Sequence, residues 1–131
     1  MFGQIKGSVA EWQPVQTPTD LARLTGKSSN NINQLKFTLR NGESSPALGG
    51  TGGTDLDFMI PADESVRKIT LKRKTHVKSA TFITNKGSEY KFGGNAGHTT
   101  LDIYVPFGFN LVGLKVASNN SRIFSIAFIF K

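Results

Sequence analysis

The sequence contains no cysteine, which excludes both a disulfide scaffold and a zinc site with cysteine ligands. No hydrophobic run reaches transmembrane length, and the N-terminus lacks the apolar core of a signal peptide, so the compartment stays open. Only nine acidic residues stand against 16 lysines and arginines, giving a formal net charge of +7. This surplus favours acidic partners such as nucleic acid, anionic lipids or sulfated and carboxylated glycans, although it also simply keeps a small domain soluble.

Motifs for catalysis and metal binding are missing as well. The two histidines, His76 and His98, are well separated in the sequence, and neither H-x-x-x-H nor G-x-S-x-G occurs. Asp55 and Asp57 would share one face of a strand, where a solvated surface is the simpler explanation. The glycine-rich stretch "LGGTGG" from Leu48 is not followed by the Lys-Ser or Lys-Thr of a phosphate-binding loop. We therefore expect a non-catalytic domain with no metal and no cofactor.

The apolar residues that are present mostly alternate with polar ones. This period of two occurs in "NQLKFTLR", "TTLDIYVP" and "IFSIAFIFK", and "SATFITN" is rich in strand-forming residues. Clusters of Gly, Asn, Ser and Pro separate these segments, and no window of about eleven residues shows a convincing helical stripe. The sequence therefore predicts an all-β protein, and its 131 residues suffice for one domain with a buried core.

An internal repeat organises the chain. An aromatic residue or Leu followed by G-x-x-x-G opens "FGQIKG", "LGGTGG" and "FGGNAG", starting at Phe2, Leu48 and Phe92. The same period of about 45 residues relates three phenylalanines and three predicted strand starts: Phe37, Phe82 and Phe128, and Leu21, Val66 and Leu111. We expect one domain over residues 1–131 with units of about 2–47, 48–91 and 92–131, each with room for four short strands.

A four-stranded sheet with one wet face cannot bury its apolar face alone, so three such sheets should surround a phenylalanine-rich core on a pseudo-threefold axis. The glycine pattern would then mark turns that need positive φ or a close approach of the backbone. The extra glycines of the middle copy, Gly50 and Gly52, are explained by close approach of a ligand in our interpretation.

The stretch from "IPADESVRK" to "FGGNAG", with "LVGLKV" and "IFSIAFIF", resembles the jacalin-related lectins, and its lysines resemble those of zymogen-granule-type lectins. The resemblance implies a β-prism of three Greek-key sheets and glycans or glycoconjugates as partners. It leaves a homo-oligomer open, since family members often dimerise. In that family a glycine loop of the first repeat and an Asp before the last strand bind mannose or galactose. Here Phe124 occupies the position of the Asp, and Asn120 the position of the Gly before it, so the usual site is altered.

The resemblance places candidate glycan-binding residues on apical loops, and the positions equivalent to Phe124 in the other repeats are Asn33 and Lys78. Asn in such loops also serves as ordinary turn chemistry. The candidates are Gly3 and Gln4; Asn30, Asn31 and Asn33; Gly50, Thr51 and Gly52; and Asn119, Asn120, Ser121 and Arg122.

The basic stretch "RKITLKRKTHVK" contains six of the 16 cations and no acid. Lys72, Arg73, Lys74 and Lys78 are candidates for binding a sulfated polysaccharide or an anionic membrane, with an affinity that falls as salt rises. The alternative is a solvated strand edge whose lysines prevent aggregation. Nucleic acid is disfavoured, because no exposed aromatic residues alternate with the cations. A third hypothesis is a protein-interaction or targeting domain of a larger protein with a degenerate sugar site.

Overall fold

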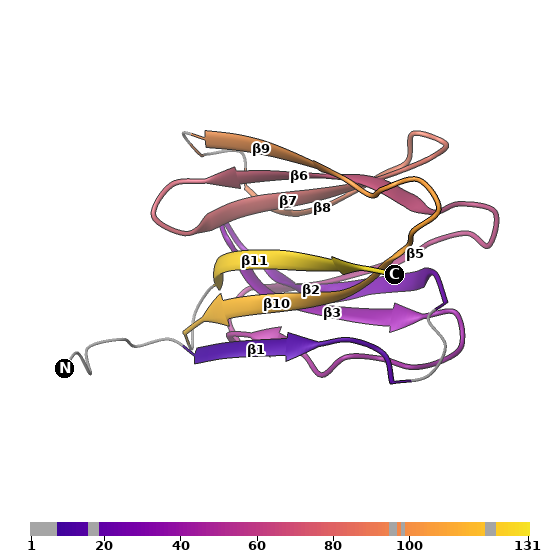
Figure 1. Cartoon of the computed structure of the whole chain (residues 1–131). Helices are drawn as coiled ribbons and strands as arrows, with labels where there is room; N and C mark the ends of the chain where they lie inside the picture. The colour runs from indigo at the N-terminus through magenta and orange to yellow at the C-terminus, as the bar shows by residue number, and fades with distance from the viewer. Residues whose placement is uncertain (1–7, 16–18, 95–96, 98, 120–122) are drawn as a thin grey trace.

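The computed structural model describes residues 8–15, 19–94, 97, 99–119 and 123–131, and within them the chain forms strands without any helix (Figure 1). The prediction of an all-β protein is confirmed. Accordingly, the described part of the chain offers no helix that could cross a membrane. The strands are β1 (Ser8–Trp12), β2 (Leu21–Ser28), β3 (Ile32–Leu39), β4 (Leu48–Gly49), β5 (Thr54–Met59), β6 (Val66–Arg73), β7 (Val77–Thr84), β8 (Glu89–Gly93), β9 (Thr99–Tyr104), β10 (Leu111–Ser118) and β11 (Ile123–Phe130).

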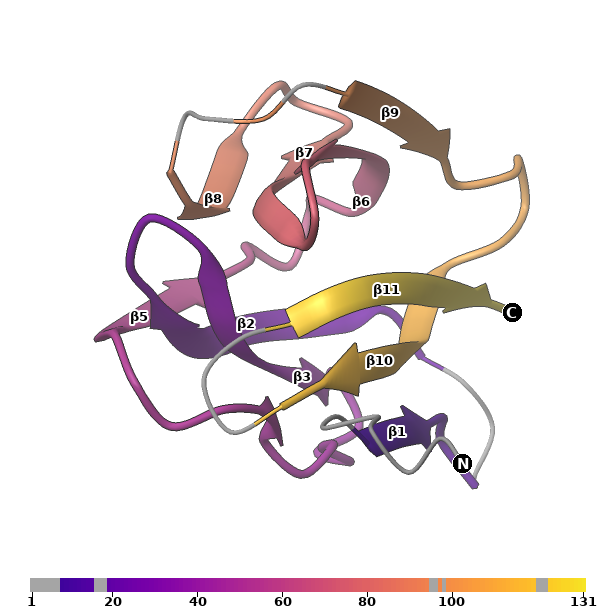
Figure 2. The same ribbon diagram turned by 90° about the vertical axis from the view of Figure 1, so that its left-hand side faces the viewer.

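The strands form three antiparallel sheets with related topology. Two sheets have the orders β4-β3-β2-β5 and β8-β7-β6-β9, and the described part of the third has the order β1-β10-β11. Seen from one end, the three sheets surround a common interior (Figure 2). The central strands β2, β6 and β10 begin at Leu21, Val66 and Leu111, the three strand starts that the repeat predicted. The arrangement is the predicted prism of three sheets.

The borders of the sheets do not coincide with the borders of the units that the glycine pattern defines. Residues 21–59 form the first sheet and residues 66–104 the second, whereas the third combines Ser8–Trp12 with residues 111–130. Each sheet therefore joins the end of one unit to the beginning of the next. A repeat has the same period wherever it is counted from, so the period predicts the symmetry but not the borders of the sheets.

The core lies where the three sheets face one another. Phe37 and Phe82 are completely buried, and Phe128 is half-buried. The ring of Phe82 meets Phe37 and Phe128 edge to face, with centroid distances of 6.0 and 5.9 Å. Each of these three rings comes from a different sheet, so the recurring phenylalanine forms the shared centre of the prism as predicted. Edge-to-face geometry is favourable because the positive edge of one ring meets the negative face of another.

The glycine turns adopt the backbone conformation that the repeat required. Gly49 and Gly93, at equivalent positions of two copies, have φ of 121° and 97°. The second glycines of the pattern, Gly53 and Gly97, have φ of 98° and 144°. Side chains with a Cβ rarely adopt such values, which explains why glycine recurs here. The turn interpretation is confirmed for these two copies, and "FGQIKG" lies outside the described residues.

The carboxylates of β5 pair with cations of β2 on the outer surface of the first sheet. Asp57 accepts two hydrogen bonds from the Arg23 guanidinium, at 2.8 and 2.5 Å, and Asp55 accepts one from Lys27 at 2.7 Å. The hydrogen bond with Arg23 lowers the pKa of Asp57 from its ordinary value. The prediction of a solvated face for these two acids is thus confirmed.

The ion pair between Arg23 and Asp57 should make the stability of the fold depend on pH. Because the pKa of Asp57 is lower in the folded state, its contribution is present above the unfolded pKa and is lost as the pH falls through the folded value. Between neutral pH and about pH 3, the urea midpoint of the wild type should therefore fall further than that of Asp57→Asn. An equal fall in both proteins would show that the pair adds no pH-dependent stability.

Candidate functional site

The turns that connect the central hairpins of the sheets gather at one end of the prism. The β2–β3 turn (residues 29–31) and the β6–β7 turn (residues 74–76) lie at the left of Figure 1, where β10 also ends and β11 begins. β5 and β9 begin at the same end, each directly after a glycine-rich turn. We call this the hairpin end. Every candidate residue that the structure describes lies in or next to it.

Asn31 connects two neighbouring sheets at the hairpin end. Its Oδ1 lies 2.8 Å from Nε2 of His76 and accepts a hydrogen bond from Nζ of Lys78 at 3.1 Å. A carboxamide oxygen only accepts, so His76 carries a proton on Nε2. Nδ1 of His76 lies 3.0 Å from the Thr75 hydroxyl. The structure thus brings a candidate from the asparagine loop and one from the basic stretch into a single cluster.

His76 is the member of this cluster that the sequence did not reveal. It is buried, with 6% of its surface exposed, although it lies in a hairpin turn. Its partner Asn31 is 45 residues earlier and belongs to another sheet. No local pattern predicts a contact between side chains of two separate turns.

Asn33 lies beneath the glycine turn that follows β4. It is the second residue of β3, as Lys78 is of β7 and Phe124 of β11, so the predicted equivalence of the three positions agrees with the strand starts. Only 7% of its surface is exposed, and its Oδ1 accepts a hydrogen bond from Ser29 at 3.1 Å. The Asn33 carbonyl accepts one from the N–H of Gly50 at 2.6 Å. Asn33 therefore shapes this turn.

The same contacts give a further reason for the second glycine of the pattern, Gly53. A Cβ on Gly53 would lie 2.8 Å from Oδ1 of Asn33, so the group that approaches this backbone closely is the protein's own side chain. Gly50 is buried, and its carbonyl accepts a hydrogen bond from Gln34 at 3.0 Å. Thr51 and Gly52, by contrast, are exposed at the tip of the turn. Close approach of a ligand to the extra glycines, Gly50 and Gly52, stays a prediction, and of these two Gly52 is the exposed one.

The remaining loop candidates divide between described and undescribed parts of the chain. Asn30 is exposed, and its backbone packs against Gly94, where an added Cβ would lie 2.9 Å from the Asn30 carbonyl oxygen. Asn119 is half-buried and follows the last residue of β10. The other candidates lie outside the described residues: Gly3, Gln4, Asn120, Ser121 and Arg122.

The hairpin end is electropositive. Lys72 is half-buried at the end of β6, and Arg73 and Lys74 are exposed at the hairpin tip. The ion pairs found among the described residues involve Arg23, Lys27, Lys68 and Lys86, and none of these three cations. All nine acids of the chain are described, and the one nearest this end is Asp55, which already pairs with Lys27. An anionic group as the partner of these cations stays a prediction.

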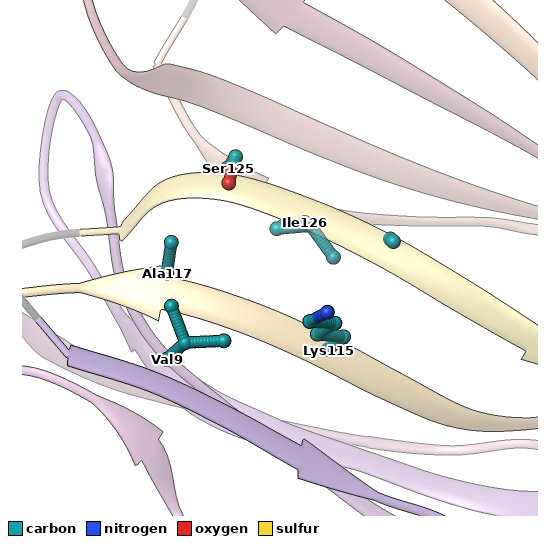
Figure 3. A pocket seen from close by; sticks show the side chains of 6 residues that line it. Val9, Lys115, Ala117, Ser125 and Ile126 are labelled. Carbon is teal, nitrogen blue, oxygen red and sulfur yellow. The ribbon is translucent and has the colours of Figure 1, made fainter.

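A pocket of about 360 Å³ lies against the sheet of β1, β10 and β11, and its lining reaches the end of β10 and the start of β11 (Figure 3). Small and apolar side chains form most of its lining, together with one ammonium group and one hydroxyl. The lining residues are Val9, Lys115, Ala117, Ser125, Ile126 and Ala127. None of them was predicted as a site residue. Among the described residues no group of three His, Asp or Glu side chains is close enough to hold a metal ion.

Three related antiparallel sheets around a common interior, with polar turns collected at one end, define the β-prism class of folds. The sequence profile of the family described as "Jacalin-like lectin domain" matches residues 1–129. The chain belongs to this family. The resemblance noted in the sequence, and with it the predicted lectin-like class, is confirmed.

Solved structures of lectins have the same fold. The prostate-specific WGA16 glycoprotein lectin is 22% identical, with a TM-score of 0.86 over 100% of this chain and 95% of that chain. The Calsepa lectin in complex with a biantennary N-glycan is 21% identical, with a TM-score of 0.73 over 95% and 89%. Artocarpin complexed with Me-α-mannose is 15% identical, with a TM-score of 0.73 over 96% and 98%. A search of curated protein sequences gives no match.

Proposed function

We propose that residues 1–131 act as one non-catalytic domain that binds glycans at the hairpin end. The observation that carries this proposal is the cluster around Asn31, which fixes the β2–β3 turn against the β6–β7 hairpin through His76 and Lys78. Turns held in this way present polar groups with little ordering cost on binding. Membership in the family of Jacalin-like lectin domains, and the bound glycan and mannoside in the Calsepa and artocarpin structures, support a sugar as the ligand.

The chemistry of the hairpin end favours a glycan that carries negative charge. A neutral sugar needs acceptors for its hydroxyl protons, and a carboxylate is the strongest acceptor available. The three equivalent positions at the second residues of β3, β7 and β11 hold an amide, an ammonium group and a phenyl ring, namely Asn33, Lys78 and Phe124. Hydrogen-bond donors are therefore in excess here. Sulfate and carboxylate groups supply the acceptors that such donors need.

Removing three cations should weaken binding to sulfated and carboxylated glycans. For the variant Lys72→Ala/Arg73→Ala/Lys74→Ala we expect a loss of affinity of about tenfold or more, and a weaker dependence on salt, since contacts between cations and a polyanion act through release of counterions. Lys78 is left intact because it bonds Asn31. A glycan array recorded at low and at high salt measures both effects.

A matched control removes the same charge away from the hairpin end. The variant Lys36→Ala/Lys91→Ala/Lys115→Ala changes the middle of β3, β8 and β10, and should keep most of the affinity. Equal losses of affinity in the two variants would show that the effect comes from net charge and not from the hairpin end. Salt-insensitive binding to neutral mannosides would contradict the anionic ligand. A silent array, together with capture of a protein partner, would contradict glycan binding altogether.

A further inference from the structure

Two turns at the end opposite the hairpin end occupy equivalent places in successive repeats and close with the same backbone hydrogen bond. They differ at the third residue, because Gly108 has φ of 84° whereas Asp63 has no positive φ. The 61–64 turn follows β5 and the 106–109 turn follows β9, one repeat later. In the first, the N–H of Glu64 donates to the Pro61 carbonyl at 3.0 Å, and in the second the N–H of Phe109 donates to the Pro106 carbonyl at 3.0 Å. The sequences are "PADE" and "PFGF". The hydrogen-bonded turn therefore forms with Ala62 at the position that Phe107 occupies in the second turn.

An arginine side chain donates hydrogen bonds to the backbone of each turn. Arg40 donates to the carbonyls of Pro61 and Glu64 at 2.7 and 3.1 Å. Arg67 donates to the carbonyl of Phe109 at 2.7 Å and lies 3.5 Å from that of Pro106. Backbone hydrogen bonds of 2.8 and 3.0 Å between Asn110 and Lys131 fix the chain directly after the second turn. The 106–109 turn is thus a fixed platform for its side chains.

That platform displays aromatic rings to solvent. Phe107 is fully exposed, and 46% of Phe109 is exposed. Tyr104, at the end of β9, is 63% exposed. Single exposed apolar residues are common, but three aromatic residues within six positions form a patch. The equivalent turn has no phenylalanine, and Phe107 is fully exposed, so packing within the domain does not account for this ring.

Three cations, Arg67, Lys68 and Lys131, lie around the patch, and Lys68 also forms an ion pair with Asp102 at 3.9 Å. Asp102 is the last acid of the sequence, so residues 103–131 contain none. Arg67 and Lys131 flank the turn, and Nζ of Lys68 lies 5.5 Å from the centre of the Tyr104 ring. Aromatic rings beside cations suit the interface of an anionic bilayer, where rings sit at the headgroup level and each cation adds attraction. A single four-residue turn is also far smaller than the patch of about 800 Å² per partner that a stable protein interface requires.

We propose that the 106–109 turn inserts Phe107 and Phe109 into the interfacial region of an anionic lipid bilayer. The turn lies at the right of Figure 1, and the hairpin end lies at the left. A domain bound to lipid in this way turns its hairpin end away from the membrane, toward ligands in solution or on another surface. This inference rests on the turn alone and is independent of the proposed glycan site.

Sedimentation with vesicles tests the proposal. The probe is a vesicle of phosphatidylcholine and phosphatidylserine in a ratio of about two to one. The wild type should sediment with it, and Phe107→Ala, which copies the residue of the equivalent turn, should lose about tenfold or more in partitioning because it no longer buries a phenyl ring. The variant Lys72→Ala/Arg73→Ala/Lys74→Ala should retain most of the binding. Phe107→Ala should in turn retain glycan binding.

A fluorescent variant locates the ring directly. In Trp12→Phe/Phe107→Trp the only tryptophan is in the turn, and vesicles should shift its emission to the blue and brominated lipids should quench it. Three results would overturn the proposal: no vesicle binding by the wild type, equal binding by Phe107→Ala, or emission unaffected by the vesicles. A dimer in sedimentation velocity that Phe107→Ala abolishes would assign the patch to a second copy of the chain instead.

Discussion

Replacing Phe82 by alanine is expected to lower the free energy of unfolding by about 3–5 kcal/mol. Phe82 is completely buried and meets the rings of Phe37, Phe92 and Phe128 edge to face, at centroid distances of 5.9–6.1 Å. Truncation would leave a cavity at the point where all three sheets meet. A loss of this size approaches the total stability of many domains, so urea denaturation followed by Trp12 fluorescence should show an early transition.

The exposed turn supplies the control for this experiment. Phe107→Ala removes the same atoms from a fully exposed side chain and should change the free energy of unfolding by no more than about 0.5 kcal/mol. The contrast separates burial from the chemistry of the substitution. If Phe82→Ala were no more destabilising than Phe107→Ala, the core could not depend on the phenylalanines that the repeat places at the centre.

The architecture was predictable because the sequence repeats with a period of about 45 residues. Leu21, Val66 and Leu111 begin the central strands where spacing placed them, and the recurring phenylalanines meet in the core. The borders of the sheets were not predictable, because the period does not indicate at which residue a sheet begins. The pairing of β1 with β10 joins Ser8 to Ser118 across almost the whole chain, and no local pattern indicates so distant a partner.

The candidate site was predictable in position but not in contacts. Spacing identified Asn33 and Lys78 as equivalents of Phe124, and the strand starts agree. The burial of Asn33 under its glycine turn, and the meeting of Asn31 with His76, depend on how two sheets pack together. A signal for the aromatic turn was available, because "PADE" and "PFGF" occupy the same place in successive repeats. Comparing the repeats by their differences would have revealed it.

Gly93→Ala should lower the free energy of unfolding by about 2–5 kcal/mol. The change lies beside the proposed glycan site. Gly93 has φ of 97°, which costs any residue with a Cβ about 1–2 kcal/mol. The added Cβ would also lie 2.1 Å from the Lys78 carbonyl oxygen and 2.8 Å from the Cα of Ser79. These are backbone atoms of a central strand, so relief of the clash requires β7 and β8 to separate, a form of overpacking that typically costs a further 1–3 kcal/mol.

Gly87→Ala isolates the clash from the backbone strain. Gly87 has a similar φ of 86°, but an added Cβ would meet no atom within 4 Å, so only the strain of about 1–2 kcal/mol should remain. The two variants should also differ in their affinity for glycan. The N–H of Gly94 donates to the same Lys78 carbonyl at 3.1 Å, and Gly94 packs on Asn30, so movement of this turn disturbs the neighbouring hydrogen bond from Lys78 to Asn31. At temperatures where both variants remain folded, Gly93→Ala should bind glycan more weakly than Gly87→Ala, and equal affinities would place the binding surface away from this turn.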